Sequence, residues 1–77
     1  MRAIVLLKTN PGFQEKAYAT LKGISVKGVQ TETVCHCFGR FDGVVICKYD
    51  DLKGLNAFTE TLRREGVFHT ETLIAID

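Results

Sequence analysis

The sequence lacks several features that define whole classes of protein. Its 77 residues contain no tryptophan and one proline, and the longest uninterrupted apolar run is the five residues Ala3–Leu7. A helix that spans a bilayer needs about 20 apolar residues, and the core of a secretory signal needs at least about 7. The sequence therefore predicts a cytoplasmic domain without a membrane segment. The low proline content argues against a linker or a disordered chain.

An excess of charge of one sign is also missing. Ten lysines and arginines face nine aspartates and glutamates, which leaves a net charge of +1, and the sequence has no polybasic block. Proteins that bind nucleic acid draw much of their affinity from basic surface against phosphate. We therefore expect no direct contact with nucleic acid.

Cysteine is scarce and odd in number. Cys35, Cys37 and Cys47 are expected as reduced thiols, since no export signal is present, and a Cys35–Cys37 disulfide is disfavoured because strand residues two apart lie roughly 6.6 Å from each other. Cys35-His36-Cys37, with Cys47 and His69, offers possible zinc or copper ligands. However, a strand places His36 on the opposite face, and C-x-C is not the paired C-x2-C of a closed zinc site. We expect no metal and no other cofactor, because free cysteine often behaves as a small buried hydrophobe.

The length supports one domain, residues 1–77. A chain of this size buries roughly 60% of the surface that its unfolded form exposes, so its margin of stability is modest. Small domains usually add a disulfide, a metal or a partner subunit. Because the first two are disfavoured here, we expect a partner subunit.

Hydrophobic periodicity divides the chain into six elements in the order β-α-β-β-α-β. Strands are expected over residues 2–8, 29–38, 44–49 and 67–76. The segments Val29–Val34 and Phe68–Leu73 resemble each other at an offset of 39 positions, about half the chain, which supports a two-fold repeat. The pattern predicts an α+β, ferredoxin-like βαββαβ sandwich of four antiparallel strands with both helices on one face.

The two helices are predicted from apolar residues three and four positions apart. Asn10 is expected to cap the first helix with Pro11 as its first residue, and Asp50 or Asp51 to cap the second, which Gly66 ends. The expected buried faces are Phe13, Ala17, Leu21 and Ile24 in the first helix and Leu52, Leu55, Phe58 and Leu62 in the second.

Two strands are apolar on both faces. Residues Ala3–Leu7 and Val44–Cys47 lack the alternation expected of an antiparallel sheet with one wet face. These strands form the central pair of a ferredoxin-like sheet, and the helices cover only one of its faces. A second sheet is the simplest cover for the other face, so we expect a homodimer with its sheets packed face to face, a dimeric α/β barrel. The alternative is a monomer with an apolar sheet face.

No catalytic constellation is enforced by spacing. The sequence shows no Ser/His/Asp or Cys/His arrangement, His36 and His69 fit surface positions on strands, and the glycines fit turns and caps rather than a phosphate loop. We expect a protein that is not an enzyme. A small dimeric α/β-barrel enzyme, oxygenase- or isomerase-like, is the alternative, and it rests on fold analogy alone.

The turn Gly39-Arg40-Phe41-Asp42 presents opposite charges on a short backbone. Such a turn can grip a zwitterion, with its carboxylate on the ligand's amine and its amides or guanidinium on the ligand's carboxylate. Asp42 and the glycines are equally residues that commonly form a turn and nothing more.

The chain resembles the ligand-binding domain, also called the RAM domain, of the leucine-responsive/asparagine-regulatory (Lrp/AsnC) family. The resemblance runs through the segments 3–12, 38–42, 51–58 and 66–74, and includes a G-x-x-D hairpin and a Thr-x-Thr in the last strand. It implies a domain that dimerises through its sheets and forms octamers or decamers. It also implies that amino-acid effectors bind at interfaces between dimers.

Transferred to this sequence, the resemblance implies a ligand-binding site formed by Gly39, Arg40, Phe41, Asp42, Thr70 and Thr72. Arg40 and Phe41 occupy the variable hairpin positions, where the choice of ligand should differ. Cys35-His36-Cys37 matches no motif of the family. Full-length members carry an N-terminal helix-turn-helix, whereas this sequence begins at the first strand and so resembles a stand-alone form. Such a domain is expected to sense amino acids, to modulate a full-length Lrp/AsnC transcription regulator by co-assembly, or to regulate another protein.

Overall fold

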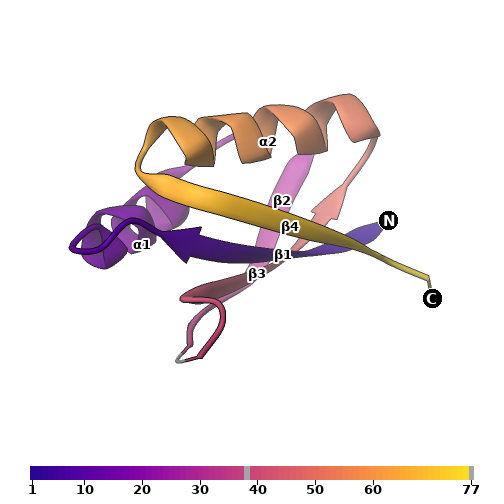
Figure 1. The fold of residues 1–77 in the computed structure, drawn as a ribbon. Coiled ribbons are helices and arrows are strands. Elements are labelled where there is room, and N and C mark those ends of the chain that lie inside the picture. The colour runs from indigo at the N-terminus through magenta and orange to yellow at the C-terminus, as the bar shows by residue number, and fades with distance from the viewer. Residues whose placement is uncertain (38, 77) are drawn as a thin grey trace.

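The computed structural model of the chain describes residues 1–37 and 39–76, so Phe38, expected at the end of the second strand, lies outside the described residues. The elements are β1 (Arg2–Thr9), α1 (Gln14–Gly23), β2 (Val29–His36), β3 (Gly43–Tyr49), α2 (Leu52–Arg64) and β4 (Val67–Ala75) (Figure 1). Their order is the one predicted, and each strand begins and ends within two residues of its expected bounds.

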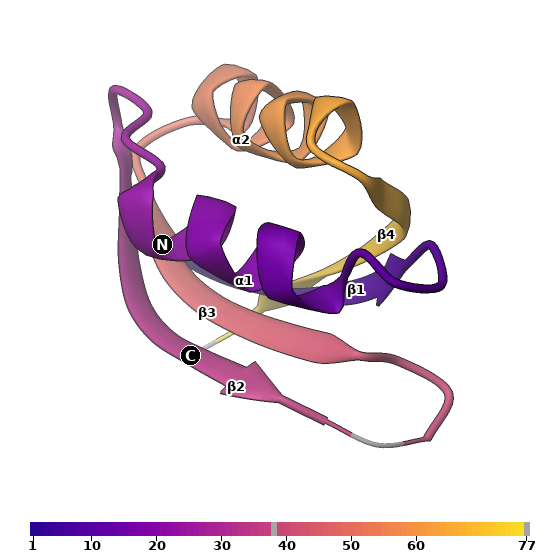
Figure 2. The ribbon, with the colours of Figure 1, turned by 90° about the vertical axis from the view of Figure 1, so that its left-hand side faces the viewer.

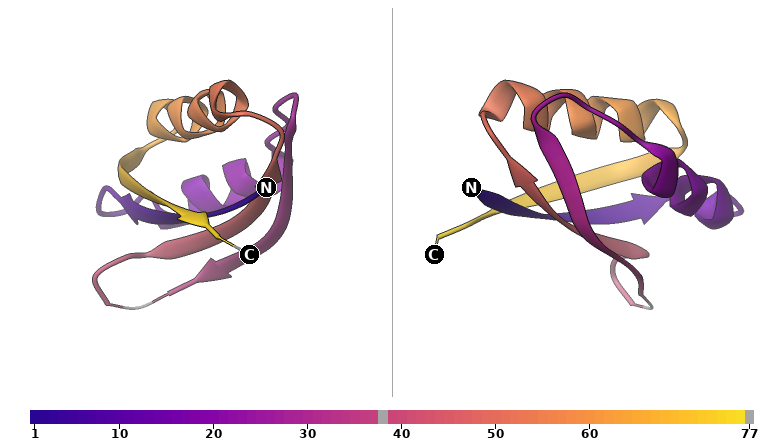
Figure 3. Two further views of the ribbon diagram at one scale, coloured as in Figure 1. Left: turned by 90° about the vertical axis from the view of Figure 1, so that its right-hand side faces the viewer. Right: turned by 180° about the vertical axis from the view of Figure 1, so that it is seen from behind.

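The four strands form one antiparallel sheet in the order β2-β3-β1-β4, with β1 and β3 as its central pair. Both described helices lie on the same face of this curved sheet (Figure 2). They leave its other face bare (Figure 3). The predicted ferredoxin-like arrangement is therefore confirmed.

The core lies between the sheet and the helices. Alternate residues of β1 and β3 point toward the helices and are at most 1% exposed: Ala3, Val5, Leu7, Val45 and Cys47. Leu55, Phe58 and Leu62 of α2 pack against them, as do Ala17 and Leu21 of α1. Leu52 was expected on the buried face but is 62% exposed, because it is the first residue of α2 and lies at the rim of the core.

The face of the sheet away from the helices is apolar at its centre. Ile4 and Leu6 of β1 lie opposite Ile46 and Val44 of β3, and all four are half-buried in the single chain. Leu73 of β4 lies opposite Ile4 and is 49% exposed. We call these five residues the outer apolar face. The prediction that both faces of the central strands are apolar is thus confirmed.

The first helix begins later than predicted. The backbone N–H of Phe13 donates to the carbonyl of Asn10 at 3.0 Å, and Gly12 between them has a φ of +86°. Proline followed by a glycine with positive φ is the pattern of a type II turn. This turn delays α1 to Gln14, so the predictions that Asn10 caps the helix and Pro11 begins it are wrong. Phe13, expected on the buried face, precedes the helix and is 41% exposed.

The second helix begins and ends where the sequence signals place it. Of the two candidate caps, Asp51 is the one used, since its Oδ1 accepts a hydrogen bond from the backbone N–H of Gly54 at 2.8 Å. The helix ends at Arg64, and Gly66 makes the turn into β4 with a φ of +98°.

Alanine at two positive-φ glycines should separate backbone strain from steric crowding. Gly12→Ala adds a Cβ into open space, so it should lower the free energy of unfolding by about 1 kcal/mol through strain alone. Gly66→Ala carries the same strain and also places its Cβ 3.0 Å from Cδ1 of Phe13, so its loss should be larger. Urea unfolding of both variants measures the difference. Equal losses of unfolding free energy in the two variants would mean that the Phe13 ring moves away from the new Cβ at no energetic cost.

Candidate functional site

Asp42 joins the β2–β3 hairpin to the end of β1. Its side-chain Oδ2 accepts hydrogen bonds from the backbone N–H of Thr9 at 2.9 Å and from the Thr9 hydroxyl at 3.0 Å. Its backbone N–H donates to the carbonyl of Leu7 at 2.8 Å, and its carbonyl accepts from the N–H of Cys37 at 2.9 Å. The pairing of β1 with β3 ends at Leu7 and Gly43. Beyond that point the Asp42 carboxylate, rather than the backbone of β3, accepts the hydrogen bond from the N–H of Thr9.

These contacts determine the charge state of Asp42. Its pKa lies below the usual range, chiefly because the backbone N–H of Thr9 stabilises the carboxylate; partial burial acts in the opposite direction, and the Thr9 hydroxyl and the positive charge of Lys8 lower the pKa further. Asp42 is therefore ionised at neutral pH. Oδ2 receives both hydrogen bonds, and within residues 1–37 and 39–76 Oδ1 accepts none.

The lowered pKa of Asp42 predicts a pH-dependent contribution to stability. A carboxyl whose pKa is lower in the folded state than its unfolded value of about 3.9 stabilises the fold above that value. The contribution is lost as the pH falls through the folded-state pKa. Urea unfolding of the wild type and of Asp42→Asn should therefore differ most near pH 6 and converge below pH 4. Thr9→Val removes only the hydroxyl donor, so its stability difference from the wild type should depend on pH in the same way but be smaller. A difference between Asp42→Asn and the wild type that does not change with pH would contradict the lowered pKa of Asp42.

The remaining hairpin residues lie toward solvent. Gly39 and Arg40 are exposed and Phe41 is half-buried. Gly39 has a φ of +124°, a value that L side chains rarely adopt, so its glycine serves the turn itself. The Nζ of Lys8 donates to the carbonyl of Arg40 at 3.3 Å, a second link between β1 and the hairpin.

The two threonines expected in the site lie on β4, one strand away from the hairpin. Thr70 is opposite Leu7 and Thr72 is opposite Val5, so both half-buried side chains lie on the helix-covered face of the sheet. Because β1 separates β4 from β3, Thr70 is roughly 10 Å from the base of the hairpin. In the described part of the chain no hydrogen bond joins the threonines to the hairpin. The structure thus groups Gly39–Asp42 and holds the threonines apart from them.

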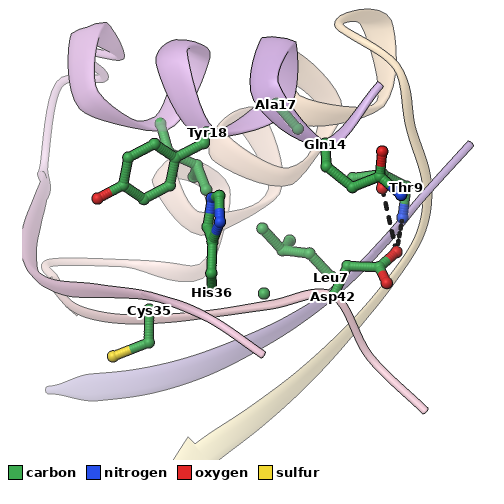
Figure 4. Close-up of a pocket in the computed structure, with 10 residues that line it drawn as sticks. Leu7, Thr9, Gln14, Ala17, Tyr18, Cys35, His36 and Asp42 are labelled. Carbon is green, nitrogen blue, oxygen red and sulfur yellow. Dashed lines mark hydrogen bonds between the residues drawn. The ribbon is translucent and has the colours of Figure 1, made fainter. Parts of the chain in front are cut away.

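A cleft between α1 and the hairpin adds residues that the sequence did not indicate. Three adjoining hollows share Gln14 and Asp42 in their linings. One of them, with a volume of about 20 Å³, reaches the core residues Leu7, Ala17 and Leu21 and is called the inner cavity; the other two measure about 300 and 290 Å³. Figure 4 shows Gln14 and Tyr18 of α1 above His36 and Asp42 across this space. We call it the α1–hairpin cleft.

His36 and Tyr18 form one wall of the α1–hairpin cleft. Their rings meet edge to face, with centroids 4.0 Å apart and planes at 78°, and the Nζ of Lys22 lies 4.6 Å from the centre of the Tyr18 ring. His36 lies on the helix side of β2, opposite Gly43, whereas Cys35 is opposite Val44 on the other face. The opposite orientation expected for Cys35 and His36 is therefore confirmed. Gln14 and Tyr18 are four positions apart and so share one face of α1, which is the sequence signal that could have placed both in the lining of the cleft.

Among residues 1–37 and 39–76, no three His, Cys, Asp or Glu side chains come together as metal ligands. Neither α1 nor α2 has the length and apolar character needed to cross a membrane.

The fold matches several solved structures. The crystal structure of FFRP-DM1 aligns with 97% of this chain and 97% of its own, at 27% identity and a TM-score of 0.81. Hypothetical protein PHS023 from Pyrococcus horikoshii aligns over 99% of this chain and 89% of its own, at 27% identity and a TM-score of 0.77. No family model and no curated protein matches the sequence.

An AsnC family transcriptional regulator from Agrobacterium tumefaciens has the same fold in part of its chain. The alignment covers 99% of this chain and 50% of the regulator, at 10% identity and a TM-score of 0.77. The chain described here therefore spans half the length of that regulator, and the likeness is one of fold. The resemblance to the Lrp/AsnC-type ligand-binding domain is confirmed at that level.

Proposed function

We propose, from the Lrp/AsnC-type fold, that residues 1–77 form a single regulatory domain that binds a free amino acid. The observation that carries this proposal is the Asp42 carboxylate. It is ionised, held in place through Oδ2, and has its Oδ1 free among the described residues. A ligand ammonium would form a charge-assisted hydrogen bond with Oδ1. The backbone amides of Arg40 and Phe41 and the exposed guanidinium of Arg40 would take the ligand's carboxylate.

The position of the threonines favours a site completed by a second copy of the chain. Thr70 and Thr72 lie across β1 from the hairpin within one chain. In the family whose fold this chain shares, effectors bind at interfaces between dimers, where groups distant in one subunit can meet across the boundary. We therefore include Gly39, Arg40, Phe41, Asp42, Thr70 and Thr72 in the proposed site.

The outer apolar face supports assembly through the sheet. Its five aliphatic side chains are each worth about 1.5–3 kcal/mol when fully buried, and part of that gain is still available because they are half-buried or exposed in one chain. We propose a face-to-face homodimer that assembles further into an octamer or decamer in the cytoplasm. Its regulatory target would be a full-length Lrp/AsnC regulator, reached by co-assembly rather than by direct contact with nucleic acid.

A role without catalysis fits the side-chain contacts. The Asp42 carboxylate accepts two hydrogen bonds from Thr9, and the positive charge of Lys8 helps to lower its pKa. An ionised and anchored carboxylate suits the binding of a cationic group.

A thermal-shift screen of the twenty amino acids tests the proposed function. A ligand at 100 times its dissociation constant should stabilise the protein by about 2.7 kcal/mol, which for a domain of this size raises Tm by roughly 10–20 °C. Asp42→Ala should abolish the response, and Thr9→Val, which leaves the carboxylate in place, should retain it. If no amino acid raises Tm, the proposed function is wrong.

A further inference from the structure

The α1–hairpin cleft leads from Asp42 to the small inner cavity, which reaches three apolar core residues. Its outer hollow, about 290 Å³, is lined by Gln14, His36, Cys37 and Asp42, and has room for the body of a small ligand. The inner cavity also has Asp42 in its lining, so the two spaces meet at that carboxylate. A ligand held on Oδ1 can thus extend a group inward.

The inner cavity sets a limit on that group. Its floor is formed by Leu7, Ala17 and Leu21, which are 1%, 3% and 4% exposed. At about 20 Å³ it holds one group of the size of a water molecule, which is also the size of a methyl. Leu7, Ala17 and Leu21 give a methyl an apolar surface to pack against, while Thr9, Gln14, Tyr18, His36 and Asp42 also line this space.

The side of this space is fixed by ring packing. Tyr18 and His36 line the inner cavity, and their edge-to-face contact at 4.0 Å holds both rings in place. His36 is itself exposed, so it forms a wall without being part of the hydrophobic core. Removing its ring would widen the cavity while leaving the core side chains intact.

We propose that the α1–hairpin cleft selects an amino acid with a methyl-sized side chain. The ammonium lies on Oδ1 of Asp42, and the side chain enters the inner cavity between α1 and the sheet. This inference rests on the proposed function, because it uses the same carboxylate. It adds Ala17 and His36 as residues that determine specificity, and it names the ligand class as short aliphatic amino acids, with L-alanine as the probe.

Calorimetric titration with glycine, L-alanine and L-leucine tests the selection. L-alanine should bind about fourfold more tightly than glycine, the value of one buried methyl, and at least tenfold more tightly than L-leucine, whose side chain exceeds the cavity. Ala17→Val fills the cavity from α1 and should reduce the affinity for L-alanine to that for glycine or below. His36→Ala removes one wall and should raise the affinity for L-leucine at least tenfold.

His69→Ala is the matched control, because it removes the other histidine, which is exposed on β4 opposite Lys8. It should leave all three affinities unchanged. If Ala17→Val does not fold, the exposed position of His36 keeps the test intact. Binding of L-leucine as tight as that of L-alanine, with no change in their ratio in His36→Ala, would overturn the inference and leave the proposed function standing. If none of the twenty amino acids binds the wild type, both fail together.

Discussion

Phe58→Ala is expected to lower the free energy of unfolding by about 3–5 kcal/mol. Phe58 is 1% exposed at the centre of the buried face of α2, and among the side chains that the structure describes it is the largest that is fully buried. Alanine would leave a cavity between the helix and the sheet, because close-packed neighbours relax only in part. A small domain has about 5–15 kcal/mol of stability, and this one is expected near the lower limit, so much of the variant should be unfolded at 37 °C.

Leu52→Ala on the same helix is the control for Phe58→Ala. Leu52 is 62% exposed, so its truncation should change the free energy of unfolding by no more than about 0.5 kcal/mol. Both variants are compared with the wild type by urea denaturation at one protein concentration, since assembly makes stability depend on concentration. Similar losses in the two variants would mean that the helix is not anchored by the face assigned here.

Ile46→Asp is expected to reduce the assembly to monomers of 8.6 kDa. Ile46 is half-buried on β3 in the outer apolar face, where it lies opposite Ile4. In the proposed dimer a carboxylate at this position would be buried without a partner, which is costly enough to oppose association. In a monomer the same carboxylate faces water. The variant should therefore keep its helix and strand content while its mass falls, as measured by sedimentation equilibrium.

Leu52→Asp is the matched control for Ile46→Asp. It places the same charge on the helical layer, on the other side of the molecule from the outer apolar face, at the first residue of α2, where a negative charge suits the helix dipole. Its assembly mass should equal that of the wild type. An Ile46→Asp variant that remains oligomeric would show that the outer apolar face is not the interface.

The fold follows from local patterns in the sequence, and the errors occur where two local patterns coincide. Runs of β-forming residues indicate the strands, and apolar residues three to four positions apart indicate the helices, so together they predict the order of elements. The segment Asn10-Pro11-Gly12 fits both the start of a helix and a type II turn. The hydrogen bond from the N–H of Phe13 to the carbonyl of Asn10 shows that it forms the turn. Leu52 has the helical spacing of the core residues, but periodicity does not show how far the core extends along a helix.

The candidate site is less accessible from sequence because it depends on contacts between distant segments. Asp42 was identified from its turn, yet its partner Thr9 is 33 positions away and becomes a neighbour only through the pairing of β1 with β3. The approach of Gln14 and Tyr18 to His36 depends on how α1 packs over the sheet. The place of Thr70 on the helix-covered face depends on the register of β4 against β1, which shifts between Lys8 and Thr9.

Successive residues of strand β1 point to opposite faces of the sheet, so the strand contributes to both the proposed ligand site and the proposed dimer interface. Thr9 holds Asp42 on one side of the sheet, and Leu6, on the same strand, belongs to the outer apolar face on the other. If ligand binding shifts the equilibrium between monomer and assembly through this strand, assembly must change the affinity for the ligand by the same factor, because the coupling between two binding events is reciprocal. Its apparent affinity would then rise or fall with protein concentration, and the cellular abundance of the protein would set the amino-acid level to which it responds.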